Sequence, residues 1–135
     1  MVKMYCKKAK EGAKRRLPSK VVPALFAAES LFLFCIALQP GYAIPAVRIP
    51  FLREGDIEHL LAYLAYGFLA FRAFSMRFQK RQNILVSVAW TMLFAGLTEG
   101  LQAFVPTRFA DPADWFVDVM GSLVGIYASA KIRLV

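Results

Sequence analysis

Sequence motifs for catalysis and metal binding are missing from this chain of 135 residues. It has one histidine and two cysteines, and it contains no HExxH, no GxSxG and no cysteine in the setting of a nucleophile. Cys6 lies in a basic N-terminal arm and Cys35 in the first apolar segment, so we expect no disulfide between them. There is also no internal repeat. These absences argue against a hydrolase or metal site of known motif, and they favour one domain.

Apolar residues, by contrast, are abundant. Hydrophobic residues make up 59% and aromatic residues 14% of the chain, and the mean hydropathy is +0.50, more than a soluble domain of this size usually carries. A bilayer core about 30 Å thick requires roughly 20 mostly apolar residues per helix. Four windows of about this size occur, at residues 21–38, 57–74, 84–105 and 115–130. The sequence therefore predicts an all-α fold, an integral membrane four-helix bundle.

The basic residues are concentrated on one side of these predicted spans. All of the 17 lysines and arginines except Arg48, Arg53 and Arg108 lie in residues 1–20, in the connection between the second and third spans, or near the C-terminus. Because lysine and arginine in short loops are retained in the cytoplasm, both termini are predicted to be cytoplasmic. The net charge of +8 then reflects topology, and we expect no nucleic acid partner. The chain divides into a basic cytoplasmic arm, residues 1–20, and a four-span membrane domain, residues 21–135.

Two other interpretations of the N-terminal region stay open. The arm has the charge to bind anionic lipid directly, with each basic residue contributing about 1 kcal/mol near such a surface. Residues 1–43 also imitate a cleaved signal peptide, because a basic segment and an apolar stretch are followed by the small-residue ending GYA. The arm is long for a signal peptide, which favours a retained first helix. Cleavage would also leave only three spans.

The acidic residues gather on the side of the predicted bundle that faces away from the cytoplasm. His59, Gln102, Tyr63 and Tyr66 lie on that side as well, although we expect the two tyrosines to be packing or interfacial aromatics. This side is acidic while the whole chain is basic, which indicates a polar cluster at the outer membrane surface. Its acids flank the outer ends of the second, third and fourth predicted helices: Glu54, Asp56, Glu58, Glu99, Asp111, Asp114 and Asp118.

Helical spacing indicates which of these residues share a face, since residues three or four apart lie together. Glu99 lies six residues before Val105, about 9 Å from the predicted helix end at 1.5 Å per residue. A carboxylate at that depth requires a partner, and we expect an ion pair with Arg108. Asp118 is followed by Gly121 and Gly125, a small-xxx-small pattern that permits another helix to approach closely, in the bundle or in a homo-oligomer. The stripes are His59 with Tyr63 and Tyr66, Glu99 with Gln102, and Asp111, Asp114 and Asp118 with Gly121 and Gly125.

These three stripes resemble the VanZ-like family of membrane proteins, which is named for a protein associated with teicoplanin resistance. The segment EHLLAYLAYG at 58–67 is similar to the family's His-x-x-x-Tyr element, and EGLQAFVPTR at 99–108 to its Glu-x-x-Gln element followed by Pro and Arg. The segment DWFVDVMGSLVG at 114–125 is similar to Asp-x-x-x-Asn-x-x-Gly-x-x-x-Gly. Order and spacing agree across residues 56–125, about half of the chain.

The chain departs from the family pattern at two positions. The family usually has an Asp-Lys pair shortly before the histidine, whereas Asp56 is followed here by Ile57. Asp118 stands in place of the family's asparagine, which adds a negative charge and puts in doubt any role that needs a neutral amide. The resemblance implies a small multi-pass protein of the bacterial inner membrane and cell envelope, sometimes linked to glycopeptide resistance.

Three classes of function account for the outer polar cluster. We favour a binding or accessory protein that takes an envelope ligand, such as a lipid-linked precursor or a phospholipid head group. The alternatives are an enzyme acting on lipid or lipid-linked glycan, with His59 or Glu99 as general base, and a structural role as interhelical contacts. A transporter is disfavoured because four spans leave little room for a pathway. The candidate ligand-binding residues are His59, Glu99, Gln102, Arg108, Asp114 and Asp118.

No cofactor is expected from the sequence. A metal ion is an open alternative, because His59, Glu99, Asp114 and Asp118 offer nitrogen and oxygen ligands to Mg²⁺, Mn²⁺ or Zn²⁺. No pair among them occurs in a known metal motif, and aspartates at the start of a helix are also favoured by the helix dipole. The sequence therefore predicts a site without metal.

Overall fold

The computed structural model describes residues 20–41 and 55–132. In these two ranges the chain forms four helices and no strand, α2 (Val21–Ala37), α3 (Asp56–Phe74), α4 (Lys80–Gln102) and α5 (Pro112–Lys131). This confirms the predicted all-α class. Nearly all of the basic arm, together with Arg48, Arg53 and Glu54, lies outside the described residues.

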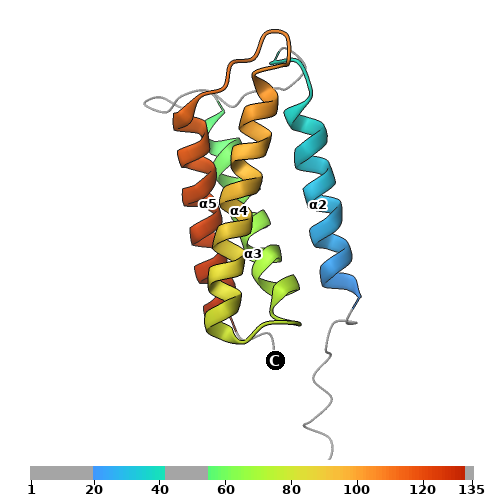
Figure 1. Cartoon of the computed structure of the whole chain (residues 1–135), viewed down its shortest axis with the longest axis vertical. Helices are drawn as coiled ribbons and strands as arrows, with labels where there is room; N and C mark the ends of the chain where they lie inside the picture. The colour runs from blue at the N-terminus through green and yellow to red at the C-terminus, as the bar shows by residue number, and fades with distance from the viewer. Residues whose placement is uncertain (1–19, 42–54, 133–135) are drawn as a thin grey trace, which may run out of the picture.

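Successive helices run in opposite directions, as Figure 1 shows. The C-terminal ends of α2 and α4 therefore meet the N-terminal ends of α3 and α5 at one end of the bundle, which we call the acidic end. Asp56 and Glu58 lie in the first turn of α3 and Asp114 in the first turn of α5. These three acids favour a helix start, since a helix N-terminus carries partial positive charge.

Local sequence sets the start of α5. Asp111 precedes the helix with extended backbone, and its side chain accepts a hydrogen bond from Ala113 N at 2.8 Å. Pro112 occupies the first turn, where its missing N–H would have had no helical partner. The cap and the proline together fix where the connection from α4 ends, and this connection carries Arg108.

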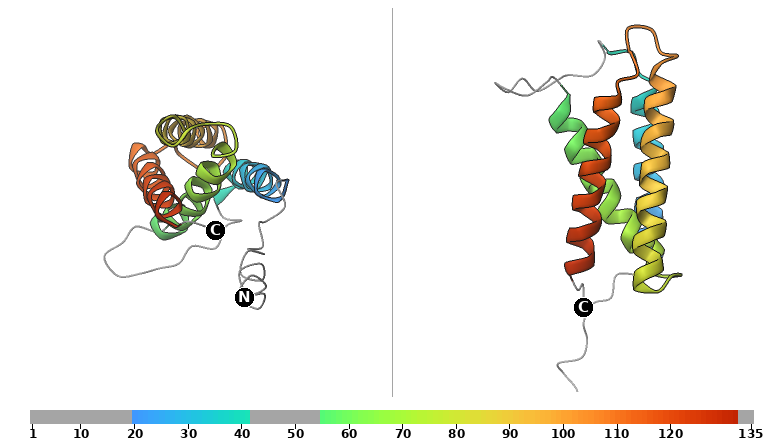
Figure 2. Two further views of the ribbon diagram at one scale, coloured as in Figure 1. Left: turned by 90° about the horizontal axis from the view of Figure 1, so that it is seen from below. Right: turned by 60° about the vertical axis from the view of Figure 1, so that its left-hand side comes forward.

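Glycines bring α3 and α5 into very close contact. A Cβ added at Gly121 would lie 2.5 Å from Leu60 O, one at Gly125 would lie still closer to Leu64 O, and one at Gly67 would collide with the backbone of Ser122. The right-hand view of Figure 2 shows α3 crossing α5 obliquely. The small-xxx-small pattern thus receives α3 of the same chain, so an oligomer formed through these two glycines would require α3 to leave.

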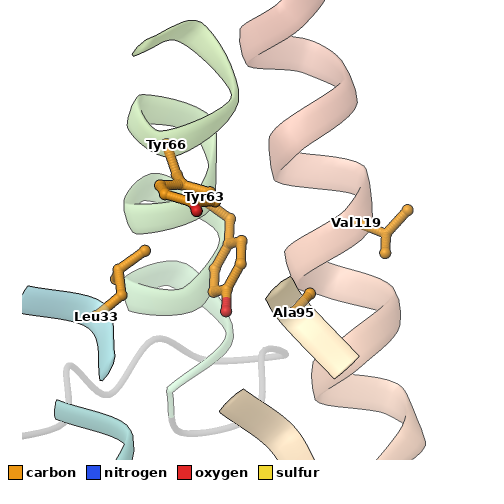
Figure 3. Close-up of a cluster of buried hydrophobic side chains, with 5 residues drawn as sticks. All are labelled: Leu33, Tyr63, Tyr66, Ala95 and Val119. Atoms are coloured by element: carbon orange, nitrogen blue, oxygen red, sulfur yellow. The ribbon is translucent and has the colours of Figure 1, made fainter. Parts of the chain in front are cut away.

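Aromatic side chains join α2, α3 and α4. Tyr66 is fully buried, with its ring 5.2 Å from that of Phe26 and 4.7 Å from that of Phe94. Its hydroxyl accepts hydrogen bonds from Trp90 Nε1 at 2.9 Å and from Ser30 Oγ at 3.2 Å. Tyr66 is therefore a packing residue, as the sequence led us to expect. The buried cluster around it, drawn in Figure 3, consists of Leu33, Tyr63, Tyr66, Ala95 and Val119.

Polar and apolar residues are distributed along α4 in the reverse of the soluble pattern. Leu85 and Leu93 are 63% and 73% exposed, whereas the face that α4 buries is mainly polar. By length and composition, α4 is the one helix in the described ranges that is suited to cross a membrane, and α2 is a shorter apolar helix. The buried residues of α4 are Asn83, Ser87, Thr91, Ala95, Thr98, Glu99 and Gln102.

Candidate functional site

A cavity of about 330 Å³ lies at the acidic end and is lined by all four helices and by the α4–α5 connection. Helix α2 contributes an apolar wall of Leu33, Ile36 and Ala37. The cavity brings together five of the six predicted site residues, and Glu99 is not among its lining residues. The polar side chains that line it are Glu58, His59, Tyr63, Thr98, Gln102, Thr107, Arg108, Asp114 and Asp118.

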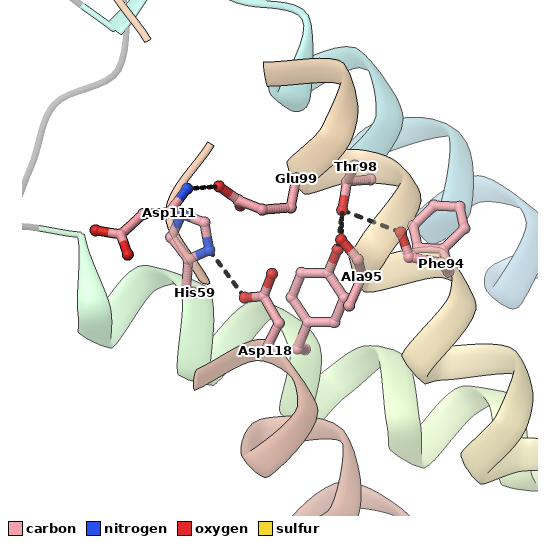
Figure 4. A network of polar contacts seen from close by, with 8 residues as sticks. His59, Phe94, Ala95, Thr98, Glu99, Asp111 and Asp118 are labelled. Carbon is pink, nitrogen blue, oxygen red and sulfur yellow. Dashed lines mark hydrogen bonds and ion pairs between the residues drawn. The ribbon is translucent and has the colours of Figure 1, made fainter. Parts of the chain in front are cut away.

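An ion pair between α3 and α5 lies in the wall of this cavity. The Asp118 carboxylate accepts a hydrogen bond from His59 Nδ1 at 2.8 Å (Figure 4). The side chain of Asp118 is 1% exposed and that of His59 is 19% exposed. Because Asp118 occupies Nδ1 and orients the ring, Nε2 is the imidazole atom left to interact with a ligand. Asp118, at a position where the resembled family has asparagine, therefore has a hydrogen-bonded partner in His59.

A second polar contact joins α3 to α4 beside the ion pair. The hydroxyl oxygens of Tyr63 and Thr98 are 2.5 Å apart. Thr98 Oγ1 lies within hydrogen-bonding distance of two carbonyls of its own helix, Phe94 O at 3.1 Å and Ala95 O at 3.0 Å. Since the single Thr98 hydroxyl proton is directed to these carbonyls, Tyr63 is the donor to Thr98. Tyr63 is thus both a core residue and part of the cavity wall.

Glu99 has a different role from the one expected. Its Oε1 accepts a hydrogen bond from the backbone N–H of Asp111 at 2.5 Å, and its Oε2 is buried without a hydrogen-bond partner. Among the described residues no ion pair joins Glu99 to Arg108, so the predicted pair is wrong. The reason is geometric, because the connection returns toward α5 and presents a main-chain amide to the carboxylate. Glu99 therefore fixes the α4–α5 connection and does not face the ligand space.

Arg108 extends from the same connection toward α2. Its Nη1 is 3.4 Å from Ile36 O, in the last turn of α2. The preceding residue, Thr107, has a φ of 71°, which is uncommon for a β-branched residue. Thr107 Oγ1 also accepts a hydrogen bond from Gly41 N at 3.2 Å. The connection thus contacts Ile36 of α2 and Gly41, which follows α2, and these two contacts hold Arg108 at the cavity.

Several parts of the site were not identified from the sequence, among them Glu58, Thr98, Thr107 and the apolar α2 wall. Glu58 was placed on the outer side but not in the site, and Thr98 was not considered. The apolar α2 wall carries no sequence signal, because leucine, isoleucine and alanine in an apolar helix do not mark a ligand site. Glu58 and Thr98 each directly precede a predicted site residue, His59 and Glu99, and that adjacency was the one available clue.

The acids of the site do not form a metal-binding cluster in the part of the chain that the structure describes. No group of three or more histidine, cysteine, aspartate or glutamate side chains there is arranged to hold a metal ion. The described carboxylates have other partners, since Asp118 pairs with His59 and Glu99 binds the Asp111 amide. The arrangement suits recognition of a polar group beside an apolar wall.

Comparison with known protein families gives a match that covers most of the chain. A family model described as VanZ/LLP1 matches residues 8–133, nearly the whole chain. This range includes α2 and much of the basic arm, which lie outside residues 56–125, where the motifs of the resemblance occur. No curated protein and no solved structure matches the chain.

Proposed function

The chain belongs to the VanZ/LLP1 family, and from this premise we propose that it is a multi-pass membrane protein that binds an amphiphilic ligand of the bacterial cell envelope. The ligand occupies the cavity at the acidic end. Its class is a lipid-linked envelope precursor or a phospholipid. Through this binding the protein contributes to glycopeptide resistance, by changing which lipid-linked molecules are accessible at the outer surface.

Helix surfaces support the membrane part of the proposal. Large apolar side chains are exposed on every helix, among them Leu31 on α2, Leu61 on α3, Leu93 on α4 and Phe116 on α5. Exposed apolar side chains in this number are unfavourable in water and favourable in hydrocarbon. The buried polar face of α4 fits the same surroundings, because helices in lipid associate through small and polar residues. We therefore propose four spans in the inner membrane with both termini in the cytoplasm.

Topology can be measured with single cysteines in a full-length protein whose native cysteines are replaced by serine. Ala110→Cys, at the acidic end, is expected to react with an impermeant thiol reagent added to intact cells. Gln79→Cys, at the opposite end, is expected to react only after the membrane is permeabilised. Both positions are exposed in the structure. Labelling of Gln79→Cys in intact cells would reverse the orientation and place the cavity in the cytoplasm.

The cavity itself carries the ligand part of the proposal. Its α2 wall is apolar, while α3, α5 and the α4–α5 connection contribute His59, Asp118 and Arg108. Ligand sites combine predominantly apolar walls with a few polar groups that fix orientation. A volume of about 330 Å³ accommodates a head group and the first part of an attached chain. A molecule with a polar head and an apolar chain matches both walls.

The His59–Asp118 contact favours a second candidate function, an enzyme acting on the head group of such a lipid. A histidine oriented by a carboxylate at 2.8 Å has the arrangement of a general base, with Nε2 as the proton acceptor. Turnover separates the two functions. An enzyme releases a changed lipid, whereas a binding protein returns the same lipid.

The binding function can be tested by filling the cavity from its apolar side. Ile36→Trp is expected to remove the lipid that copurifies with the full-length protein and to abolish any gain in glycopeptide tolerance. Leu31→Trp is the matched control, because Leu31 lies on the same helix but is 64% exposed. The measurement is mass spectrometry of bound lipids relative to the host membrane. Lipid content equal to that of the surrounding bilayer in all three proteins would contradict the proposal.

The polar side of the cavity provides an independent test. Gln102→Ala is expected to abolish the cellular phenotype while folded protein still accumulates in the membrane. If Gln102 serves only as an interhelical contact, yield and detergent stability will fall together with the phenotype. A phenotype that persists in a well-expressed Gln102→Ala protein would remove this residue from the site.

A further inference from the structure

We infer that the ligand of this cavity carries an anionic group, a phosphate or a carboxylate, and that Arg108 is the residue that binds it. The inference rests on the proposed function and specifies its head-group chemistry. It depends on three features of the described residues. These are the hydrogen bonds that Arg108 makes, the partners of the carboxylates around it, and the attachment of the connection that carries it.

The hydrogen-bonding capacity of Arg108 is mostly unused. A guanidinium has five N–H donors in a planar arrangement that matches phosphate and carboxylate oxygens. In the described part of the chain Arg108 makes one hydrogen bond, a long one of 3.4 Å to Ile36 O, and no ion pair. Its side chain is half-buried in the cavity wall. A partly buried arginine with so few partners is a binding site for an anion.

The carboxylates of the same wall do not neutralise Arg108. Asp118 is paired with His59 at 2.8 Å, and Glu58 and Asp114 each have an interaction as well, although Glu58 Oε2 accepts no hydrogen bond. The three acids would suggest a cationic ligand if they were considered alone. A cationic ligand would have to compete with the partners that these acids already have. An anionic ligand instead meets the N–H donors of Arg108, most of which make no hydrogen bond in the described part of the chain. The cavity therefore favours an anionic head group.

The connection between α4 and α5 places Arg108 next to the apolar wall. After Arg108 in the chain, the Asp111 amide donates a hydrogen bond to Glu99. Before it, Thr107 Oγ1 accepts a hydrogen bond from Gly41 N. Thr107 adopts a φ of 71°, a conformation that surrounding contacts must maintain. Arg108 donates to the carbonyl oxygen of Ile36, and Ile36 also lines the cavity. An apolar chain attached to the anion would thus start at the α2 wall.

The experiment uses the full-length protein in detergent micelles and native mass spectrometry. The probes are farnesyl monophosphate, farnesol, farnesylamine, a phosphatidylglycerol and a diacylglycerol, with inorganic phosphate as a competitor. Wild-type protein is expected to bind the two phosphate lipids more tightly than their neutral counterparts. Arg108→Gln is expected to weaken phosphate-lipid binding by about 10-fold to 100-fold, as for loss of a hydrogen bond to a charged group. Farnesol binding should change little.

Arg77→Gln is the matched control, because it removes the same charge from an exposed position outside the cavity. Its lipid binding should equal that of the wild type. Selective binding of the monophosphate identifies a lipid carrier as the source of the anion, and selective binding of phosphatidylglycerol identifies a phospholipid. Either result supports the inference if the Arg108→Gln substitution weakens the binding of that lipid.

Other results separate this inference from the proposed function. Equal binding of farnesol and farnesyl monophosphate, unaffected by Arg108→Gln, would overturn the anion site and leave an amphiphile site in place. Preference for farnesylamine would overturn it as well. Inorganic phosphate that binds as tightly as the lipids would retain the anion site and contradict the amphiphilic ligand. Absence of binding by every probe would contradict both.

Discussion

Gly125→Ala is expected to destabilise the protein by about 3 kcal/mol or more, at the upper end of what overpacking costs. The added Cβ would collide with Leu64 O, a main-chain atom that cannot rotate away, and its next neighbour is Phe68 N at 2.8 Å. Helices α3 and α5 would therefore have to separate along their whole contact. The separation would also move His59 away from Asp118. The measurement is the free energy of unfolding in a reversible detergent titration, followed by tryptophan fluorescence.

Gly100→Ala is the control for this substitution. Gly100 is also a helical glycine, but a Cβ there meets no atom within 4 Å. Alanine is a better helix former than glycine by about 1 kcal/mol, so this variant should be unchanged or slightly more stable. Equal stability of the Gly125→Ala protein and the wild type would show that α3 and α5 are further apart than the structure places them.

His59→Ala is expected to lower the free energy of unfolding by about 3–5 kcal/mol, the usual cost of removing one partner from a buried ion pair. It leaves Asp118, which is 1% exposed, without a counter-ion. Asp118→Asn should cost much less, because an amide oxygen still accepts from His59 Nδ1 and the more exposed imidazole can remain neutral. The same detergent titration measures both variants.

The double variant His59→Ala, Asp118→Asn tests whether charge causes the loss. Neither position carries a charge in this double variant, so most of the stability lost in His59→Ala should return. If the double variant is as unstable as His59→Ala, packing around the imidazole and not its charge is the cause. Ligand binding gives a separate readout, because a site role for His59 predicts that binding stays weak after stability has recovered.

The amino-acid sequence was sufficient to predict the helices and the place where most polar residues meet. Four apolar windows predicted four helices, because the length of a mostly apolar segment can be read directly from the sequence. The α4 helix nevertheless begins at Lys80, before the predicted window at residue 84. Hydropathy does not detect its first turn, since Lys80, Arg81 and Gln82 are polar. The predicted up-and-down order of the spans placed His59, Gln102 and Asp118 at one end, and helical spacing indicated which residues of each helix share a face with them.

Contacts that depend on the path of the chain could not be predicted in the same way. The Glu99–Arg108 pair was inferred from closeness in sequence, but the turn at Thr107 and the cap at Asp111 direct an amide toward Glu99 instead. The partner of Gly121 and Gly125 was likewise open, since a small-residue stripe does not specify which helix approaches it. Both contacts depend on tertiary geometry, which cannot be predicted from the periodicity of one segment.

The contact between α3 and α5 has a consequence for how the protein is made. The backbone of α3 at Leu60 and Leu64 packs on a helix that is not its neighbour in the chain, because α4 is synthesised between them. On the proposed topology, α3 and α4 enter the membrane before the ribosome has produced Gly121. The surface of α3 at Leu60 and Leu64 therefore remains uncovered until α5 is made, and the cavity lacks the residues that α5 contributes before that time. Nascent chains stalled before Pro112 should consequently be degraded by membrane proteases, however well their first helices insert.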